Sequence, residues 1–314
     1  MSAEGRAFDV FAGSAPPERL AVVRIAVFGF GALYLAVRST SIMSVTDLDE
    51  RRFAPIGPVS LLDDPIGSTA LLALLVVTIA ACVAATVGYR WRVSSVVAAV
   101  GLAMILTYRL SWGQVLHTEN LLVAHAILLA FMPAADAWAV DARELDHQGW
   151  DHRGFGARER ESWVYGWALQ TLAVATVVGY LLAAWAKAKN GGVDWVTGDV
   201  LRNHIAYDNL QKKLLGDVSS PFASVVVPYG WLFPPMAAAS MVIEIGALAA
   251  IARGTIRTWW VAFTWLFHVA ILALMAILFP YQLLGIAFLP FLKGEEIVRR
   301  FSRAFRRRRE AQHR

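Results

Sequence analysis

Hydrophobic residues in this chain are gathered into long, nearly uncharged runs separated by short polar segments. Runs of roughly 18–20 apolar residues are typical of helices that cross a membrane, because a helix of that length spans the hydrocarbon core. The pattern therefore predicts an all-α fold, a polytopic membrane helix bundle with about eight transmembrane helices. The predicted helices cover residues 20–38, 68–88, 93–111, 118–134, 162–187, 230–252, 257–278 and 280–293.

The last of these runs is short, and Pro280 in "MAILFPYQLLGIAF" separates it from the run before it. Proline ends or kinks a helix, because it lacks the amide hydrogen and its ring clashes with the preceding turn. Two alternatives stay open for 280–293, a short complete span or a re-entrant piece.

A more polar segment, "WVTGDVLRNHIAYDNLQKKLL" at 195–215, has too many charges to span a membrane. Its apolar residues recur at roughly helical spacing, which predicts an amphipathic helix. Such a helix either lies on the outer membrane surface, caps a cavity or is an ordinary surface helix. The apolar residues in question are Val200, Leu201, Ile205, Leu210, Leu214 and Leu215.

Basic residues between the apolar runs predict the orientation, because cytoplasmic loops carry an excess of Lys and Arg. With an even number of spans, the basic loops and the tail fall on one side, so we expect a multi-pass protein of the cell (plasma) membrane with both termini in the cytoplasm. The loops at 39–67 and 188–229 are then outside. The basic residues are Arg90, Arg92, Arg143, Arg153, Arg158, Arg160, Arg253, Arg257 and the tail "RRFSRAFRRRREAQHR".

Composition agrees with a membrane protein, since 57% of the 314 residues are hydrophobic and 17% are charged. The net charge of +5 comes largely from the tail. An arginine cluster directly after an apolar run indicates a juxtamembrane anchor, so we expect no nucleic-acid partner. The division predicted is a cytoplasmic N-terminal tail at 1–19, one membrane domain at 20–297 and a basic cytoplasmic tail at 298–314. The only cysteine, Cys82, is expected to pack as a small apolar residue.

Ionisable residues at membrane depth are costly, by about 2.5–3.5 kcal/mol each on insertion scales, so each requires a partner or a purpose. Glu244 in "MVIEIGALA" and His268 in "WLFHVAILALM" lie deep in apolar runs, and we expect them to face a shared interior. Arg24 and Arg109 lie near the ends of their runs and are expected to snorkel to the headgroups. No metal site is predicted, because a HExxH spacing is absent.

Three blocks of the sequence carry a resemblance to a known family. These are "SWGQVLHTENLLVAHAILLAFMPAADAWAVDA", "YLLAAWAKAKNGGVDWVTGDVLR" and "EIGALAAIARGTIRTWWVAFTWLFHVAILALMAILFPYQLLGIAFLPF". In this order and with these lengths they resemble the HTTM (horizontally transferred transmembrane) domain, which is shared with vitamin K-dependent gamma-carboxylases. The resemblance covers most of residues 20–293.

The resemblance implies chemistry at Lys187. In the carboxylase branch a lysine at this position is regarded as the base that deprotonates vitamin K hydroquinone, and the oxygenated quinone then drives glutamate carboxylation. A reduced, vitamin K-like quinone is accordingly the implied cofactor. Carboxylases carry a large extra-membrane domain after the helices, and Asp136 stands where they have a histidine. We therefore do not expect full carboxylation of peptide glutamates.

Three classes of function stay open. The first is an enzyme-like protein whose outward-facing pocket binds or oxidises a quinol-type lipid and uses it for a modification reaction. The second is a non-enzymatic binding protein with a membrane or exported protein partner, and the third is a small-molecule transporter. Lys187 is then either a base or a snorkelling anchor beside Trp185 and Trp195, whereas Lys189 is interfacial. Besides Lys187 as the candidate base, the candidate ligand-binding residues are His117, Glu119, Glu244, His268 and Trp195.

Overall fold

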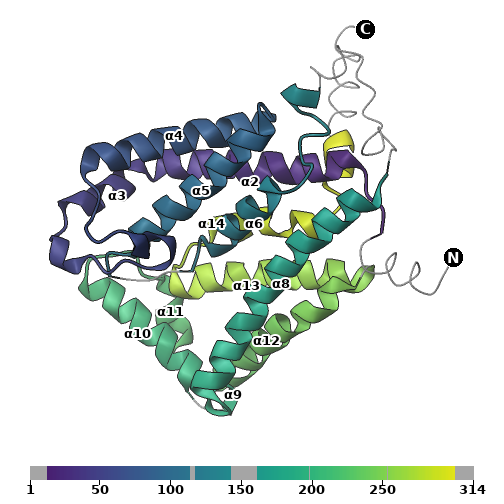
Figure 1. Ribbon diagram of the computed structural model, residues 1–314. Helices are drawn as coiled ribbons and strands as arrows, with labels where there is room; N and C mark the ends of the chain where they lie inside the picture. Colours follow the sequence, from purple (N-terminus) through teal and green to yellow (C-terminus); the bar gives the residue numbers. More distant parts are fainter. Residues whose placement is uncertain (1–12, 114–116, 143–160, 198, 253, 301–314) are drawn as a thin grey trace, which may run out of the picture. The chain divides into compact units, whose positions relative to one another are not determined.

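The computed structural model describes residues 13–113, 117–142, 161–197, 199–252 and 254–300. Within these ranges the protein is built from helices and loops, and the extended backbone is confined to an isolated antiparallel bridge between Ala15 and Ser162. The predicted all-α class is thereby confirmed (Figure 1). Several basic positions used for the orientation, namely Arg143, Arg153, Arg158, Arg160, Arg253 and the tail from residue 301, lie outside the described residues.

Six helical segments among the described residues are long and apolar enough to cross a membrane. Two further predicted spans are shorter than expected. The run predicted at 118–134 forms a helix only over α6, Asn120–Ala130. The six segments are α2 Pro17–Val37, α4 Ser68–Val87, α5 Trp91–Leu110, α8 Trp163–Gly191, Gly230–Ile251 (η4 Gly230–Leu232, α12 Phe233–Ile245 and η5 Gly246–Ile251) and α13 Thr255–Met275.

The segment predicted at 280–293 is broken into two pieces, α14 Pro280–Leu283 and the 3₁₀-helix η6 Ile286–Phe291. Gly285 between them has φ +75°, a left-handed conformation that ends a helix and that glycine adopts without strain. Pro290 inside η6 further prevents a regular α-helix. The segment is therefore not a single continuous spanning helix.

The longest of the remaining elements is α10 Val200–Leu214, which lies in the segment predicted at 195–215. The others are short, namely α3 Ser39–Met43, η1 Ser44–Asp47, η2 Glu50–Arg52, η3 Gly57–Leu61, α9 Asp194–Thr197 and α11 Pro221–Val226.

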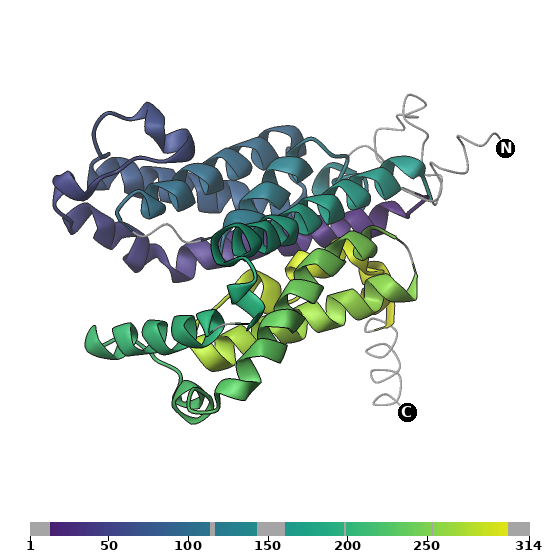
Figure 2. The same ribbon diagram turned by 90° about the horizontal axis from the view of Figure 1, so that it is seen from below.

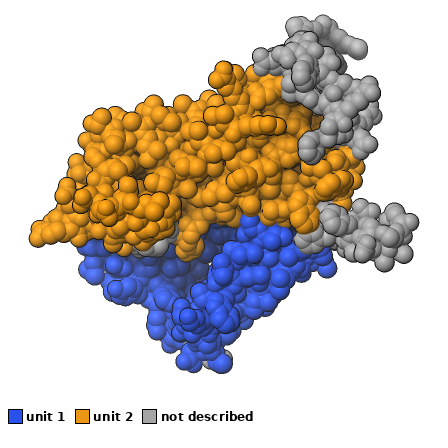
Figure 3. Space-filling model, in the orientation of Figure 1, with its two compact units in different colours: residues 1–11, 173–291 blue, residues 12–172, 292–314 orange. Residues whose placement is uncertain are grey.

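The chain divides into two compact units, which Figure 3 colours separately. Unit 1 comprises residues 1–11 and 173–291, and unit 2 comprises 12–172 and 292–314. Helix α8 begins in unit 2 and continues into unit 1.

Unit 2 is a bundle in which α2 packs against α4 and α6, and α5 packs against α4 and α6. Helices α4 and α5 approach closely at Gly101, where an added Cβ would lie 2.1 Å from Thr78 Oγ1. Small residues at such contacts let membrane helices pack tightly. The packing role predicted for Cys82 is confirmed, because its side chain is buried in this unit.

Arg24 of α2 does not snorkel, which corrects the expectation from the sequence. Its side chain is fully buried in unit 2, and its guanidinium donates hydrogen bonds to three carbonyl oxygens in the turn after α6. The acceptors are Ala134 (2.7 Å), Ala137 (3.1 Å) and Trp138 (2.6 Å). A planar group with several donors satisfies carbonyls of this irregular turn that would otherwise be unpaired, which explains its burial.

The described start of the C-terminal tail is helical and is tied to the beginning of α2. Residues 294–300 form a helix, and Glu295 accepts a charge-assisted hydrogen bond of 2.7 Å from Arg19. Arg299 also pairs with Glu18 at 3.2 Å. The tail predicted from residue 298 thus begins as a continuation of this helix.

Unit 1 is organised around α13, which contacts α10, α11, α12, η5, α14 and η6. Figures 1 and 2 show α10 and α11 beside the C-terminal end of α13. The amphipathic segment predicted at 195–215 consists of two helices, α9 and α10. Its six apolar positions do not form one stripe, because Ile205 is buried whereas Leu210, Leu214 and Leu215 are exposed.

Candidate functional site

The candidate site in unit 1 is centred on an ion pair between α8 and α12. Lys187 Nζ lies 2.6 Å from Glu244 Oε1, and the two side chains are only 18% and 4% exposed. Ser240, one helical turn before Glu244, is the second polar neighbour, with its Oγ 3.5 Å from Lys187 Nζ. The charge of each group is therefore compensated by the other, as a pair shielded from water requires.

Two aromatic rings border the ammonium group of this pair. Lys187 Nζ lies 5.1 Å from the ring centroid of Trp195 and 5.5 Å from that of Phe267. Both distances fall within the range of cation–π attraction, which is stronger where water is excluded. Lys187 therefore lies between α9 and α13 as well as beside α12.

The two glycines after α8 explain how Trp195 reaches Lys187. Gly192 has φ +53°, a left-handed conformation that ends α8 and turns the chain into α9. At Gly191 an added Cβ would lie 3.2 Å from the Cβ of Trp195, so the indole folds back closely over the end of the helix. The sequence "KNGGVDW" thus builds a turn that returns an aromatic ring to the lysine.

His268 of α13 belongs to the same unit and has a polar partner from α8. The hydroxyl of Tyr180 and Nε2 of His268 share a hydrogen bond of 2.7 Å, and both side chains are buried. Aromatic rings surround the two, with Trp260 edge-on to Tyr180 at 5.4 Å and Phe279 at 4.9 Å from His268. This hydrogen bond satisfies Nε2 of a histidine that lies in an apolar helix.

Two buried polar atoms at the ion pair have no hydrogen-bond partner among the described residues. They are Glu244 Oε2, an acceptor, and Trp195 Nε1, a donor. An unsatisfied buried polar atom costs about 1–3 kcal/mol, so such atoms require an explanation. One donor and one acceptor beside a single cation form a pattern that a ligand with a hydroxyl and a second oxygen would satisfy.

His117 and Glu119 belong to unit 2, so the structure does not assign them to the group around Lys187. Glu119 is buried and accepts hydrogen bonds from Tyr34, Thr118 and Arg109, the last at 3.0 Å. Arg109 therefore pairs with a carboxylate within unit 2, where snorkelling was expected. His117 is exposed in the turn that precedes α6.

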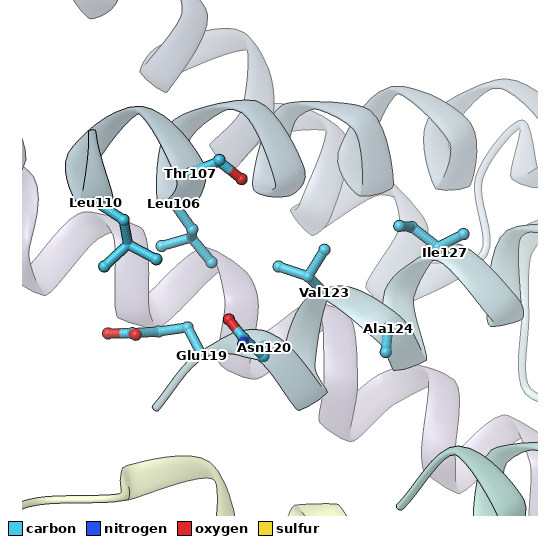
Figure 4. A pocket seen from close by; sticks show the side chains of 8 residues that line it. All are labelled: Leu106, Thr107, Leu110, Glu119, Asn120, Val123, Ala124 and Ile127. Carbon is cyan, nitrogen blue, oxygen red and sulfur yellow. The ribbon is translucent and has the colours of Figure 1, made fainter. Parts of the chain in front are cut away.

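Glu119 also lines a small pocket of unit 2, which Figure 4 shows from close by. The pocket has a volume of about 260 Å³, and its walls come from α5 and α6. Both carboxylate oxygens of Glu119 already accept hydrogen bonds. Glu119 therefore connects α2, α5 and the start of α6. The lining residues are Leu106, Thr107, Leu110, Glu119, Asn120, Val123, Ala124 and Ile127.

Sequence reasoning missed Tyr180, Ser240 and Phe267. A positional signal existed for the first two, since Tyr180 precedes Lys187 by seven residues and Ser240 precedes Glu244 by four. Both spacings place side chains on one face of a helix. Within the ranges described, no three His, Cys, Asp or Glu side chains come together as metal ligands.

Comparison with known proteins yields a family match. The HTTM domain matches residues 14–293, which is nearly the whole chain. Neither the curated proteins nor the solved structures contain a match to this sequence.

Proposed function

This chain belongs to the HTTM domain family, and we propose that this integral membrane protein binds a lipid-soluble quinol at the Lys187–Glu244 pair and takes up a proton from it. The observation that carries the proposal is the set of unpaired atoms at the pair, the acceptor Glu244 Oε2 and the donor Trp195 Nε1. A ring hydroxyl matches the acceptor, and a second ring oxygen matches the donor.

Two aromatic side chains beside the pair support a ligand with a planar ring. Trp195 and Phe267 each present a flat apolar ring face near the Lys187 ammonium group. Aromatic rings prefer offset or edge contacts with other rings, so these side chains suit a planar ring system. A ligand dissolved in the bilayer would reach them without crossing water.

The pair supplies the two groups that proton uptake requires, a proton acceptor and a positive charge that stabilises the anion left behind. Glu244 Oε2 accepts the proton of a hydroxyl placed against it, while Oε1 remains bonded to Lys187. Lys187 keeps its positive charge beside the negative charge that is left on the ligand, and in a low-dielectric setting that attraction is strong. A quinol bound here would supply an acidic hydroxyl and an electron-rich ring. In this arrangement Glu244 is the proton acceptor, whereas the family resemblance implies that Lys187 is the base.

Binding of a short-chain reduced naphthoquinone to the protein in lipid vesicles, followed anaerobically by tryptophan fluorescence, tests the proposal. We expect Lys187→Ala and Glu244→Gln to weaken affinity at least tenfold, which corresponds to about 1.4 kcal/mol. Lys189→Ala is the matched control, because Lys189 is exposed on the same helix end. Equal affinity of wild type and both site variants would refute the quinol site.

Lys187→Arg assigns the roles within the pair. Arginine keeps the cation but stays protonated, so it cannot act as a base. If the variant binds the probe but no longer takes up its proton, Lys187 itself is the base. If proton uptake persists, Glu244 is the acceptor, and Lys187 supplies only the charge.

A further inference from the structure

We propose that residues 200–226, the α10–α11 segment, lie in the lipid headgroup region where α13 ends, and that they contact the bilayer through an exposed apolar surface. This inference is independent of the quinol site. The exposed apolar surface consists of Tyr207, Leu210, Leu214, Leu215, Val218, Phe222 and Val225.

The first observation is that the α10–α11 segment caps the end of a membrane helix. The last carbonyl groups of a helix have no partner within it, and in lipid each of them needs one. Asn209 Nδ2 donates to Leu274 O at 2.9 Å, and Lys212 Nζ donates to Met275 O at 2.5 Å. Ser220 Oγ donates to Ala273 O. The segment is therefore fixed to the last turn of α13.

Further hydrogen bonds hold α10 and α11 together at this end. Ser220 N donates to Asn209 Oδ1 at 2.7 Å, and Ser220 Oγ also accepts from the amides of Phe222 and Ala223 at the start of α11. The same serine thus caps α11 at its N-terminus and α13 at its C-terminus. The position of the two short helices at the end of α13 is thereby determined by polar groups.

The inner side of the segment is already occupied. Ile205 and Ala223 pack with Phe233 in a buried cluster, to which Leu274 and Met275 of α13 contribute. Ile205 and Asn209, one turn apart on α10, face this cluster and the end of α13. The inner face therefore needs no further partner.

The opposite side of α10 is also apolar in the C-terminal half of the helix, yet it is exposed. Tyr207, Leu210 and Leu214 are spaced at one helical turn each and lie roughly half a turn away from Ile205 and Asn209. Their exposed fractions are 67%, 56% and 78%. Val218 at 74% and Phe222 at 61% continue the surface through the loop into α11. An apolar surface of this size on a water-facing helix would be unfavourable.

Lipid is the occupant that fits this position. The surface begins at the level where a membrane-spanning helix ends, which is the boundary between acyl chains and headgroups. Tyrosine and tryptophan are enriched at that boundary, and Tyr229 and Trp231 follow α11 with 55% and 73% exposure. Lys213 on the side of α10 is exposed and suits the polar headgroups.

Fluorescence quenching in the full-length protein tests the proposal. Single cysteines replace Leu214, Phe222 or Lys213 in a Cys82→Ala background and are labelled with an environment-sensitive fluorophore. The protein is placed in vesicles of phosphatidylcholine and phosphatidylglycerol that carry a nitroxide near the headgroup. Lys213 is the matched control, because it is exposed about a quarter turn away from the exposed apolar surface.

We expect labels at Leu214 and Phe222 to be quenched several-fold more by the nitroxide lipid than the label at Lys213, and several-fold less by aqueous iodide. Equal iodide quenching at all three positions would place the surface in water and overturn the proposal. Protection of Leu214 and Phe222 from both quenchers would show that protein covers the surface, and this result would also overturn it. If a variant fails to fold, Leu210→Cys replaces Leu214→Cys, and Val225→Cys replaces Phe222→Cys.

Discussion

Lys187 Nζ and Glu244 Oε1 lie 2.6 Å apart, so a side chain near the end of α8 and one near the end of α12 form an ion pair that is largely shielded from water. Breaking a buried pair by removing one partner is costly because it leaves an uncompensated charge, whereas removing both partners is often nearly neutral. The pair therefore joins two membrane helices and at the same time provides polar atoms for the proposed quinol site.

The first prediction concerns the stability of this pair. We expect Glu244→Leu to lower the free energy of unfolding by about 3 kcal/mol, the lower end of the usual 3–5 kcal/mol because Lys187 is 18% exposed. The double variant Glu244→Leu, Lys187→Met should be about 0.5–3 kcal/mol more stable than the sum of the two single losses would give. Denaturant unfolding in mild detergent measures these differences, with Lys189→Met as the control. Additive effects would show that the two residues do not interact.

The second prediction concerns Arg24. Lysine keeps the charge but lacks the planar guanidinium group with its several N–H donors. Arg24→Lys therefore leaves some of the carbonyls of Ala134, Ala137 and Trp138 without a donor. Each lost partner costs about 1–3 kcal/mol, and we expect a total near 3 kcal/mol. Thermal unfolding of the purified protein measures the loss. Arg51→Lys is the control, because Arg51 is exposed, and an equal effect of the two changes would contradict the interpretation.

The third prediction tests the close approach of α4 and α5. A methyl group at position 101 would lie 2.1 Å from Thr78 Oγ1, so Gly101→Ala forces the two helices apart. We expect a loss of about 1–3 kcal/mol, as is typical of overpacking. Gly179→Ala in α8 is the control, because its Cβ would have no neighbour within 4 Å and alanine favours a helix. Equal stability of Gly101→Ala and the wild type would contradict this packing.

The fourth prediction concerns orientation, which follows from the basic loops. Cysteines placed singly at Ser44 and Ser302 in a Cys82→Ala background should react differently with a membrane-impermeant maleimide in intact cells. We expect Ser44→Cys to be labelled and Ser302→Cys to be protected, because the positive-inside rule places the tail in the cytoplasm. The reverse labelling pattern would invert the topology.

The sequence by itself determined the helical class and the positions of the long spans. A bilayer permits only helices or closed barrels, and a spanning helix must be apolar over its whole length, so each span is visible in a local window. The predicted helices at 68–88 and 93–111 accordingly agree with α4 and α5 to within a few residues. The same reasoning failed at 280–293, where Pro280 and Gly285 divide an apolar run that composition alone does not divide.

Only the tertiary structure decided the partners of the polar residues. Lys187 and Glu244 are 57 positions apart and Arg24 and Ala134 are 110 apart, so neither relationship has a local signature. The sequence shows that a charge in an apolar helix needs compensation, because the desolvation cost applies wherever the helix packs. Which group provides that compensation depends on helix packing, which follows from shape complementarity over many residues and not from the period of one segment.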